Sequence, residues 1–307
     1  MTGQQPSPRE QAREALLDWY RPRRKAYPWR APARRGARRP DAYAVLVSEI
    51  MLQQTQASRV APAFEAFMTR FPDVRALASA SLADVLRSWD RLGYPRRAVA
   101  LHRAAGQIVE QHDGVVPRDP ETLRTLAGVG DYTSAAVACL AHGVPIVVVD
   151  TNARRVWARV DRCAEPDEVP RRELQLAADA WLDRRHPEAW NQALMDLGRE
   201  VCRPAPRCGE CPLRPWCAFA AAERTGRPSA RRAPKYEGSL RQVRGAVTAE
   251  LRARSPRTVG TIVRATGHPA SRIGEAVRGL HEDGVVVASP AALEGRERGL
   301  VALPGEG

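Results

Sequence analysis

Apolar residues recur at helical spacing along most of the first 220 residues. Between residues 10 and 20, Ala12, Leu16 and Trp19 fall on one stripe, which predicts an amphipathic helix. Similar stripes predict helices over residues 43–51, 60–71, 82–92, 96–111, 134–142 and 153–160. No sustained alternation of apolar and polar residues, the mark of a strand, occurs before the C-terminal end. The pattern therefore predicts an all-α fold for this part of the chain.

The C-terminal part has a different pattern. Residues 221–235 are rich in Arg, Pro and Ala, a composition typical of a linker. After them, helices are expected at about 239–253, 257–266 and 270–282, followed by apolar stretches at 285–288 and 300–303. Three helices and a hairpin predict a small winged-helix-like tail.

Length and composition narrow the class of protein. The chain has 307 residues, of which 44% are hydrophobic, enough for about two domains with real cores. No stretch approaches the roughly 20 apolar residues of a membrane helix. Residues 1–9 are polar and lack the apolar core of a signal peptide. These features predict a cytoplasmic protein with no membrane association.

The charge indicates the kind of partner. Lys and Arg total 48 against 35 Asp and Glu, a net charge of +13. Such an excess favours a polyanionic partner, most often nucleic acid. Only Lys25 and Lys235 are lysines, which limits any chemistry that needs an amine.

Four of the six cysteines are clustered. They follow the pattern Cys202-x5-Cys208-x2-Cys211-x5-Cys217, whereas Cys139 and Cys163 stand alone. In a reducing compartment such a cluster is more often a metal site than a pair of disulfides. Four thiolates suit either a [4Fe–4S] cluster or one zinc ion. A single C-x2-C pair with wide flanks favours iron–sulfur over a zinc ribbon.

A glycine-rich turn precedes the helix expected after residue 130. Gly128 and Gly130 allow a tight hairpin, and the next helix is expected to begin at Asp131. Free backbone N–H groups at a helix start can bind a phosphate oxygen. The segment predicts a helix-hairpin-helix that contacts a DNA backbone, with an ordinary packing turn as the alternative.

Two carboxylates stand where they could do chemistry. Glu49 lies on the flank of an apolar stripe, and a partly buried carboxyl there could act as a general acid. It could equally be a satisfied carboxylate at a helix end. Asp150 follows an apolar run and precedes a helix, so it is an N-cap candidate that could also stabilise a developing cation. Gln53, Gln54 and Thr55 form a polar cluster able to read a base edge.

Together these segments resemble the helix-hairpin-helix, iron–sulfur DNA glycosylases of the endonuclease III superfamily, and within them the adenine-specific branch. The resemblance covers about residues 19–219, some two thirds of the chain. It rests on the four cysteines and on residues 28–30, 48–56, 92–94, 128–130, 149–152 and 191–198. The segment around Glu49 is specific to the adenine branch.

The resemblance implies a fold and a domain order. A six-helix barrel over residues 25–137 carries the hairpin, and residues 1–24 and 138–222 form a helical domain around a [4Fe–4S] cluster. A linker over 223–238 leads to the tail over 239–307. A resemblance to the compact members of the family implies that this tail stands in place of the Nudix-like C-terminal domain of larger members. DNA is bent and the target base is flipped into the cleft between the two domains.

The resemblance also implies roles for named residues. Glu49 matches the acid that protonates adenine N7, and Asp150 matches the carboxylate that stabilises an oxocarbenium-like sugar, as in glycoside hydrolysis. The remaining expected residues are Arg30 and Asn152 in the active site, and Trp29, Gln54, Thr55, Tyr94, Gln192, Gly128 and Gly130 on DNA or the bases. The resemblance implies a monomer whose partner is duplex DNA with adenine opposite 8-oxoguanine or guanine.

Tyr132 decides the expected type of glycosylase. It stands where bifunctional relatives carry a Schiff-base lysine, and a lyase of that type needs an amine. The chain is therefore expected to be a monofunctional adenine glycosylase. Two alternatives stay open: a thymine glycosylase acting on G:T mismatches, and a DNA-binding module with a degenerate active site.

Overall fold

A computed structural model describes residues 5–32, 39–90, 92–227 and 235–306. The chain divides into two compact units. Unit 1 comprises Met1–Val45, Arg118–Arg124 and Gly130–Arg232, and unit 2 comprises Leu46–Pro117, Thr125–Val129 and Ala233–Gly307. Residues 228–234 of the expected linker lie outside the described residues, and the domain limits inferred from the resemblance stay predictions.

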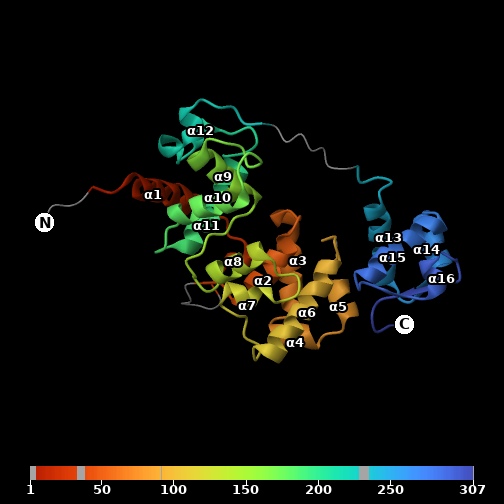
Figure 1. The fold of residues 1–307 in the computed structure, drawn as a ribbon. Coiled ribbons are helices and arrows are strands. Elements are labelled where there is room, and N and C mark those ends of the chain that lie inside the picture. Colours follow the sequence, from red (N-terminus) through yellow and green to blue (C-terminus); the bar gives the residue numbers. More distant parts are fainter. Residues whose placement is uncertain (1–4, 33–38, 91, 228–234, 307) are drawn as a thin grey trace. The chain divides into compact units, whose positions relative to one another are not determined.

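Unit 1 is helical in its described residues (Figure 1). Its elements are α1 (Pro8–Tyr20), the 3-10 helices η1 (Arg21–Arg23) and η2 (Pro28–Arg30), α7 (Pro120–Arg124), α8 (Asp131–Leu140), α9 (Thr151–Arg162), α10 (Arg171–Trp181), α11 (Pro187–Glu200), η3 (Cys208–Glu210), η4 (Arg214–Trp216) and α12 (Ala218–Ala221).

Local sequence explains where α1 begins. Ser7 and Glu10 form a capping box, in which the Ser7 hydroxyl accepts from the Glu10 N–H and the Glu10 carboxylate accepts from the Ser7 N–H. This reciprocal pair satisfies two backbone donors that a helix start leaves open. The helix therefore starts a little earlier than the apolar stripe predicts.

Aromatic packing forms the core of unit 1. The ring of Trp157 on α9 lies 5.9 Å from that of Trp181 and 6.2 Å from that of Trp190, measured between centroids. Gly198 on α11 allows close approach to α9, because a Cβ there would lie 2.8 Å from the Asn152 Cβ. This core fixes α9, α10 and α11 together.

Unit 2 holds most of α2 (Ala42–Leu52) and two further groups of elements. The first group is α3 (Ala57–Arg70), α4 (Val74–Ser79), α5 (Leu82–Ser88) and α6 (Arg96–Gln111). Phe67, Phe71 and Trp89 pack edge to face in its core, with centroids 4.9 and 6.0 Å apart. The helix expected over 82–92 ends at Ser88, because the chain then turns through left-handed backbone at Gly93 and Tyr94.

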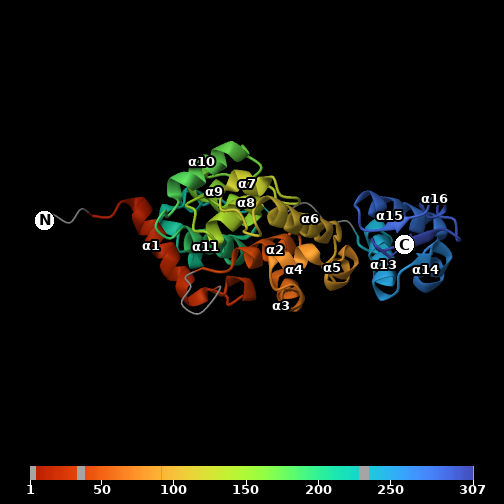
Figure 2. The same cartoon turned by 90° about the horizontal axis from the view of Figure 1, so that it is seen from below.

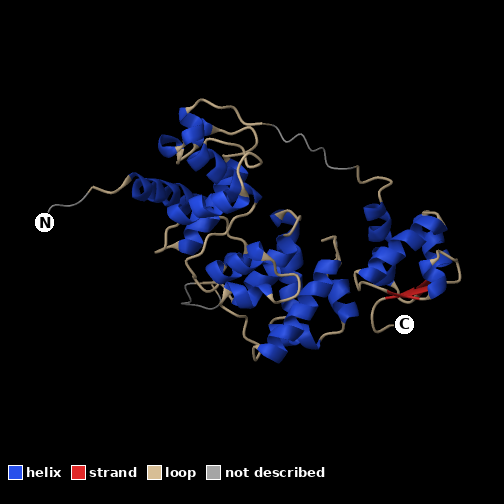
Figure 3. Ribbon diagram, viewed as in Figure 1, coloured by secondary structure: helices blue, strands red, loops and turns tan. Residues whose placement is uncertain are grey.

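The second group of unit 2 is the C-terminal tail (Figure 2). It contains α13 (Leu240–Ala253), β1 (Arg257–Thr258), α14 (Val259–Thr266), α15 (Ala270–Glu282), β2 (Val287–Ala288), α16 (Pro290–Leu293) and β3 (Leu300–Ala302). The strands form an antiparallel sheet in the order β1-β3-β2, with Arg257 opposite Val301 and Val287 opposite Ala302. All strands of the described chain lie in this tail (Figure 3). This order of helices and strands confirms the winged-helix prediction; β1 is too short for a pattern to reveal.

Ion pairs join the tail to the rest of unit 2. The Arg87 guanidinium lies 2.7 Å from the Glu306 carboxylate, and that of Arg252 lies 3.0 Å from Asp90. Arg87 also donates to the Arg252 carbonyl at 3.4 Å. Among the residues described, no helix is long and apolar enough to cross a membrane.

Candidate active site

Asp150 caps the start of α9. One of its carboxylate oxygens accepts from the Ala153 N–H at 2.6 Å, and the other accepts from the Asn152 side-chain amide at 2.8 Å. The backbone just before it is also held, since the buried Asn191 side chain accepts from the Val148 N–H at 2.8 Å. The N-cap prediction is confirmed, and both oxygens of the carboxylate are fixed in direction.

Arg155 connects this cap to the cysteine loop. Its guanidinium donates to the Asn152 side-chain oxygen at 3.0 Å and to the carbonyls of Gly198 and Cys202, both at 2.6 Å. Burial lowers the pKa of Arg155. Sequence reasoning missed this residue, because nothing in the local pattern distinguishes it from the other arginines of α9.

Side chains of neighbouring helices hold both Arg30 and Gln192: α11 supplies the partner of Arg30, and α1 supplies the partner of Gln192. The Arg30 guanidinium makes two parallel bonds to the buried Asp196 carboxylate, at 3.2 and 3.3 Å. Gln192 is buried and accepts from the Tyr20 hydroxyl at 2.7 Å. Burial raises the pKa of that hydroxyl.

Two expected aromatic residues of unit 1 are also held by neighbours. Trp29 is buried and stacks on Tyr27, with centroids 4.8 Å apart and planes 7° apart. Tyr132 lies in the first turn of α8, and its hydroxyl is 3.6 Å from the Met195 sulfur.

The glycine hairpin has the expected form, but its two glycines differ. Gly128 has a φ of 76°, and a Cβ there would lie 2.7 Å from the Ala100 Cβ. Gly130 has ordinary extended backbone, and a Cβ on it would meet nothing within 4 Å. Gly130 is the N-cap of α8, which begins at Asp131 as predicted and has no side-chain cap. Only Gly128 is required by backbone conformation.

Glu49 lies on α2, and only 5% of the surface of this residue is exposed. It follows the fully buried Ser48 and precedes the buried Ile50. The carboxyl is thus more deeply buried than a position on the flank of the apolar stripe suggests.

Gln54 and Tyr94 share an uncommon backbone conformation. Their φ values are 57° and 46°. These values lie in the left-handed region, which residues other than Gly, Asn and Asp rarely adopt. Such residues cost free energy and cluster at functional sites. Thr55 lies beside them, with its hydroxyl 3.3 Å from the Leu92 carbonyl.

Arg97 joins the two segments that carry Gln54 and Tyr94. Its buried guanidinium donates to the carbonyls of Ile50 and Met51 at 2.9 Å, and to those of Leu92 and Gly93 at 2.9 and 3.1 Å. Burial lowers the pKa of Arg97 to about 10, so it is charged at neutral pH. The sequence gives no sign of this role, because Arg97 follows another arginine in a helix of ordinary composition.

The four clustered cysteines line one cavity of unit 1. Its other walls include the apolar side chains of Val156, Leu197 and Phe219. Burial raises the pKa of the Cys202 and Cys217 thiols, and that of Cys211 to about 12. A raised pKa keeps these thiols protonated at neutral pH, and a bound metal would favour the thiolate form. In the part of the chain that is described, no three His, Cys, Asp or Glu side chains meet as closely as a single metal ion requires.

The expected residues thus fall into two sets. Unit 1 holds Asp150, Asn152, Arg30, Trp29, Tyr132, Gly130, Gln192 and the four cysteines, and unit 2 holds Glu49, Gln54, Thr55, Tyr94 and Gly128. Asp150 contacts Asn152 directly, and Gln54, Thr55 and Tyr94 line one groove.

Several known proteins with similar sequences are named adenine DNA glycosylase. Residues 47–178 match the HhH-GPD superfamily of base excision DNA repair proteins. The adenine DNA glycosylase of Mycolicibacterium smegmatis is 44% identical over 238 residues, which cover 77% of this chain and 79% of that protein. The adenine DNA glycosylase of Mycobacterium tuberculosis is 41% identical over 98% of this chain and 96% of its own length. The tail therefore has a counterpart in a relative.

Solved structures agree on the fold. A thermostable thymine-DNA glycosylase matches 70% of this chain and 97% of its own length, with a TM-score of 0.63 and 26% identity. An endonuclease III in complex with DNA matches the same share of this chain with a TM-score of 0.57, and at 20% identity it shows the fold alone. The helix-hairpin-helix glycosylase fold and the adenine branch predicted from the sequence are confirmed. The chain belongs to the adenine DNA glycosylase family, within the HhH-GPD superfamily of base excision DNA repair proteins.

Proposed function

We propose that this chain is a monofunctional DNA glycosylase that removes adenine mispaired with 8-oxoguanine or guanine. The observation that carries the proposal is 41% identity to an adenine DNA glycosylase over almost the full length of both chains. The buried Glu49 and the capped Asp150 supply the two carboxyl groups that the reaction needs.

In this mechanism Glu49 is the general acid. Its buried carboxyl donates a proton to adenine N7, which makes the base a neutral leaving group. General acids of this kind typically contribute about 100-fold to 10,000-fold to a rate. The N-glycosidic bond then breaks, and its electron pair leaves with the base.

Asp150 acts on the sugar. Breaking the bond leaves positive charge on C1′ and the ring oxygen, and a carboxylate with a fixed direction stabilises that charge. The bonds from Ala153 and Asn152 hold Asp150 in that direction before the substrate arrives. Water then adds to C1′ and gives up a proton, which restores the protonated Glu49 carboxyl, and the products are free adenine and an abasic site.

The position of Tyr132 favours a monofunctional enzyme. A phenol hydroxyl cannot form a Schiff base with the opened sugar, and the tyrosine is 3.6 Å from a thioether rather than an amine. Lys25 forms a partly exposed ion pair with Glu200 at 3.0 Å, and neither Lys25 nor Lys235 stands in the hairpin motif. Strand cleavage by this chain is therefore not expected.

We also propose that Cys202, Cys208, Cys211 and Cys217 hold a [4Fe–4S] cluster. One zinc ion requires four ligands at about 2.3 Å from a single point, whereas the four irons of a cluster spread the thiolates around a larger core. Four cysteines around one cavity suit the second arrangement. When bound, the cluster would tie η3 and η4 to α9 and α11.

The cluster proposal has a direct test. Purified protein should contain about four iron atoms per chain and should show the visible absorption typical of iron–sulfur proteins. Cys211→Ser should lose iron, while Cys139→Ser, at a buried cysteine outside the cavity, should retain it. Equal iron in the two variants would contradict the proposed ligand set.

The activity test uses duplexes labelled on one strand and carrying 8-oxoguanine:A, G:A or G:T. Products are separated with and without alkali, which cuts abasic sites. Cleavage at adenine only after alkali is the expected result. Cleavage at thymine would favour the alternative raised by the similarity to a thymine-DNA glycosylase, and cleavage without alkali would contradict a monofunctional enzyme.

A further inference from the structure

A groove in unit 2 has one wall from the barrel helices and one from the tail. Gln54, Tyr94 and Arg96 line the first wall, and Tyr236, Arg241 and Arg244 of the α13 region line the second. The left-handed residues held by Arg97 therefore face a surface that belongs to the winged helix. The sequence motifs of the glycosylase do not include any residue of the second wall.

The charge of the groove is strongly positive. Five of the lining side chains are arginines, and Asp283 is the one acidic residue among the lining residues described. Two of the arginines are already engaged, because Arg244 pairs with Asp283 and Arg252 pairs with Asp90. Arg96 and Arg241 are exposed, so they are available to an anion from solvent.

Arg241 connects the two walls. Its guanidinium donates to the Tyr94 hydroxyl at 3.3 Å and lies over the Tyr236 ring, 5.1 Å from the centroid. A guanidinium held against an aromatic ring keeps its other N–H groups directed outward. These groups can make paired bonds to a phosphate.

We propose that this groove binds the sugar-phosphate backbone of the DNA strand that carries the purine opposite the adenine. The inference rests on the proposed function, because Gln54 and Tyr94 are the residues expected beside that purine. Arg241 and Arg96 contact phosphates, and Tyr236 keeps the Arg241 guanidinium in position. The winged-helix tail is thus part of the substrate-binding surface.

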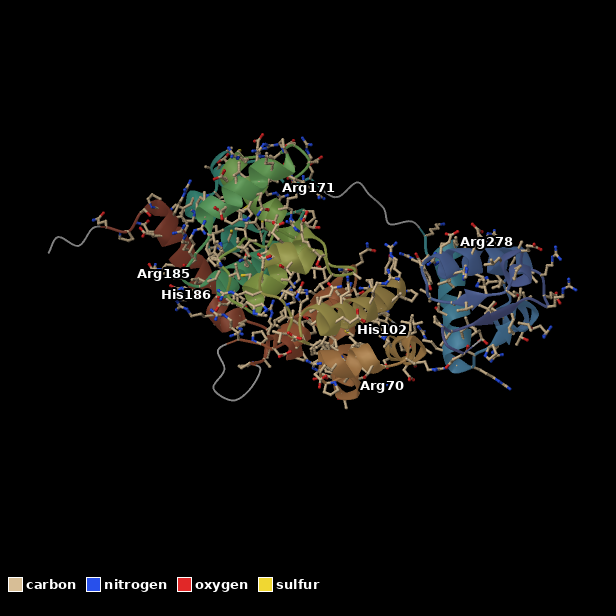
Figure 4. The ribbon with its side chains drawn as sticks, turned by 60° about the horizontal axis from the view of Figure 1, so that its bottom comes forward. Arg70, His102, Arg171, Arg185, His186 and Arg278 are labelled. Atoms are coloured by element: carbon tan, nitrogen blue, oxygen red, sulfur yellow. The ribbon has the colours of Figure 1, made fainter. Side chains whose placement is uncertain are left out.

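The first experiment measures binding by fluorescence anisotropy on an 8-oxoguanine:A duplex. Glu49→Gln is the background, so that the substrate stays intact. Arg241→Ala should weaken binding about fivefold to twentyfold and reduce the slope of log K against log salt by about 1. The matched control is Arg278→Ala on α15, an exposed arginine of the same domain that does not line the groove (Figure 4).

Equal binding by the Arg241→Ala and Arg278→Ala variants would overturn the proposal. Equal thermal unfolding of the two variants shows that neither effect comes from loss of the tail's fold. Tyr94→Phe is combined with Arg241→Ala in a double-mutant cycle. Non-additive losses are expected, because the phenol and the guanidinium are in contact.

A second experiment identifies the strand. Single neutral methylphosphonate linkages are placed along either the purine strand or the adenine strand. In the Glu49→Gln background, a linkage near the 8-oxoguanine should weaken binding by the chain that keeps Arg241, but it should not weaken binding by Arg241→Ala any further. The same loss from linkages in the adenine strand alone would assign the groove to the other strand and overturn the proposal.

These readouts are independent of excision. If the wild-type chain fails to release adenine, the proposed function fails, whereas the difference between Arg241→Ala and Arg278→Ala still reports on the groove. If excision occurs and the two variants bind alike, the function stands and the groove proposal falls.

Discussion

Asp150 and the pair formed by Gln54 and Tyr94 are fixed in opposite ways. Asp150 takes its position from donors two and three residues ahead of it, Asn152 and Ala153. Gln54 and Tyr94 depend on Arg97, which donates to the Gln53 carbonyl 44 residues earlier in the chain. The carboxylate expected to act on the sugar is therefore positioned by one helix start, whereas the two residues expected beside the purine require two distant segments to be held together.

The largest expected effect comes from removing the charge of Asp150 while keeping its size and the cap bond from the Ala153 N–H. Asp150→Asn should lower the single-turnover rate of adenine release by about 100-fold to 1,000-fold, because the amide cannot stabilise a cation. Asn is as good an N-cap as Asp, but its amide nitrogen cannot accept the bond from Asn152, so stability should fall by about 1 kcal/mol. Single-turnover kinetics and urea unfolding measure the two quantities.

Glu49→Gln serves as the companion variant for Asp150→Asn. It should lower the rate of adenine release by a comparable factor, because it removes the proton that the leaving base needs, and it should leave duplex binding largely intact. An active variant at either carboxyl would contradict the mechanism.

The next effect comes from breaking the long-range contacts. Arg97→Met should lower the free energy of unfolding by about 2–5 kcal/mol, because it leaves several buried carbonyls without their donor. Binding to a mispaired duplex should weaken as Gln54 and Tyr94 lose their backbone conformation. Urea unfolding and anisotropy at a temperature where the variant is folded test both effects.

Arg97→Lys is the control for the loss of charge. An ammonium keeps the charge but cannot reach both segments with a planar fork, so intermediate values are expected. Full recovery by the lysine would show that charge, rather than the set of hydrogen bonds, fixes the two segments.

The hairpin offers a comparison of smaller effects between two glycines that lie two positions apart, Gly128 and Gly130. Gly128→Ala should cost about 1–3 kcal/mol, since its φ is 76° and its Cβ would collide with Ala100. Gly130→Ala should change stability by about 1 kcal/mol or less, because the backbone there is extended and open. Thermal unfolding ranks the two, and equal losses would contradict this account of the turn.

Local signals allowed much of this to be predicted from the sequence. The stripe over residues 96–111 gave the bounds of α6, and the Asp150 cap followed from an apolar run before a helix. The tail was predicted as three helices and a hairpin, because short Gly-bounded apolar stretches mark strands even in a small module. The family followed from motifs whose spacing along the chain is itself the signal.

Many of the chain's helices, its four-cysteine loop, its Asp150 cap and its family could thus be predicted from the sequence alone, because each depends on neighbours within a few residues or on a motif. Helices such as α10 and α11 were not predicted. The tertiary structure decided the rest. In the fold, Arg97 bonds to carbonyls of two distant segments, Arg155 links α9 to the cysteine loop, and Arg241 lies beside Tyr94. Arginines are spread through this chain, and only the folded partners of each one give it a particular role.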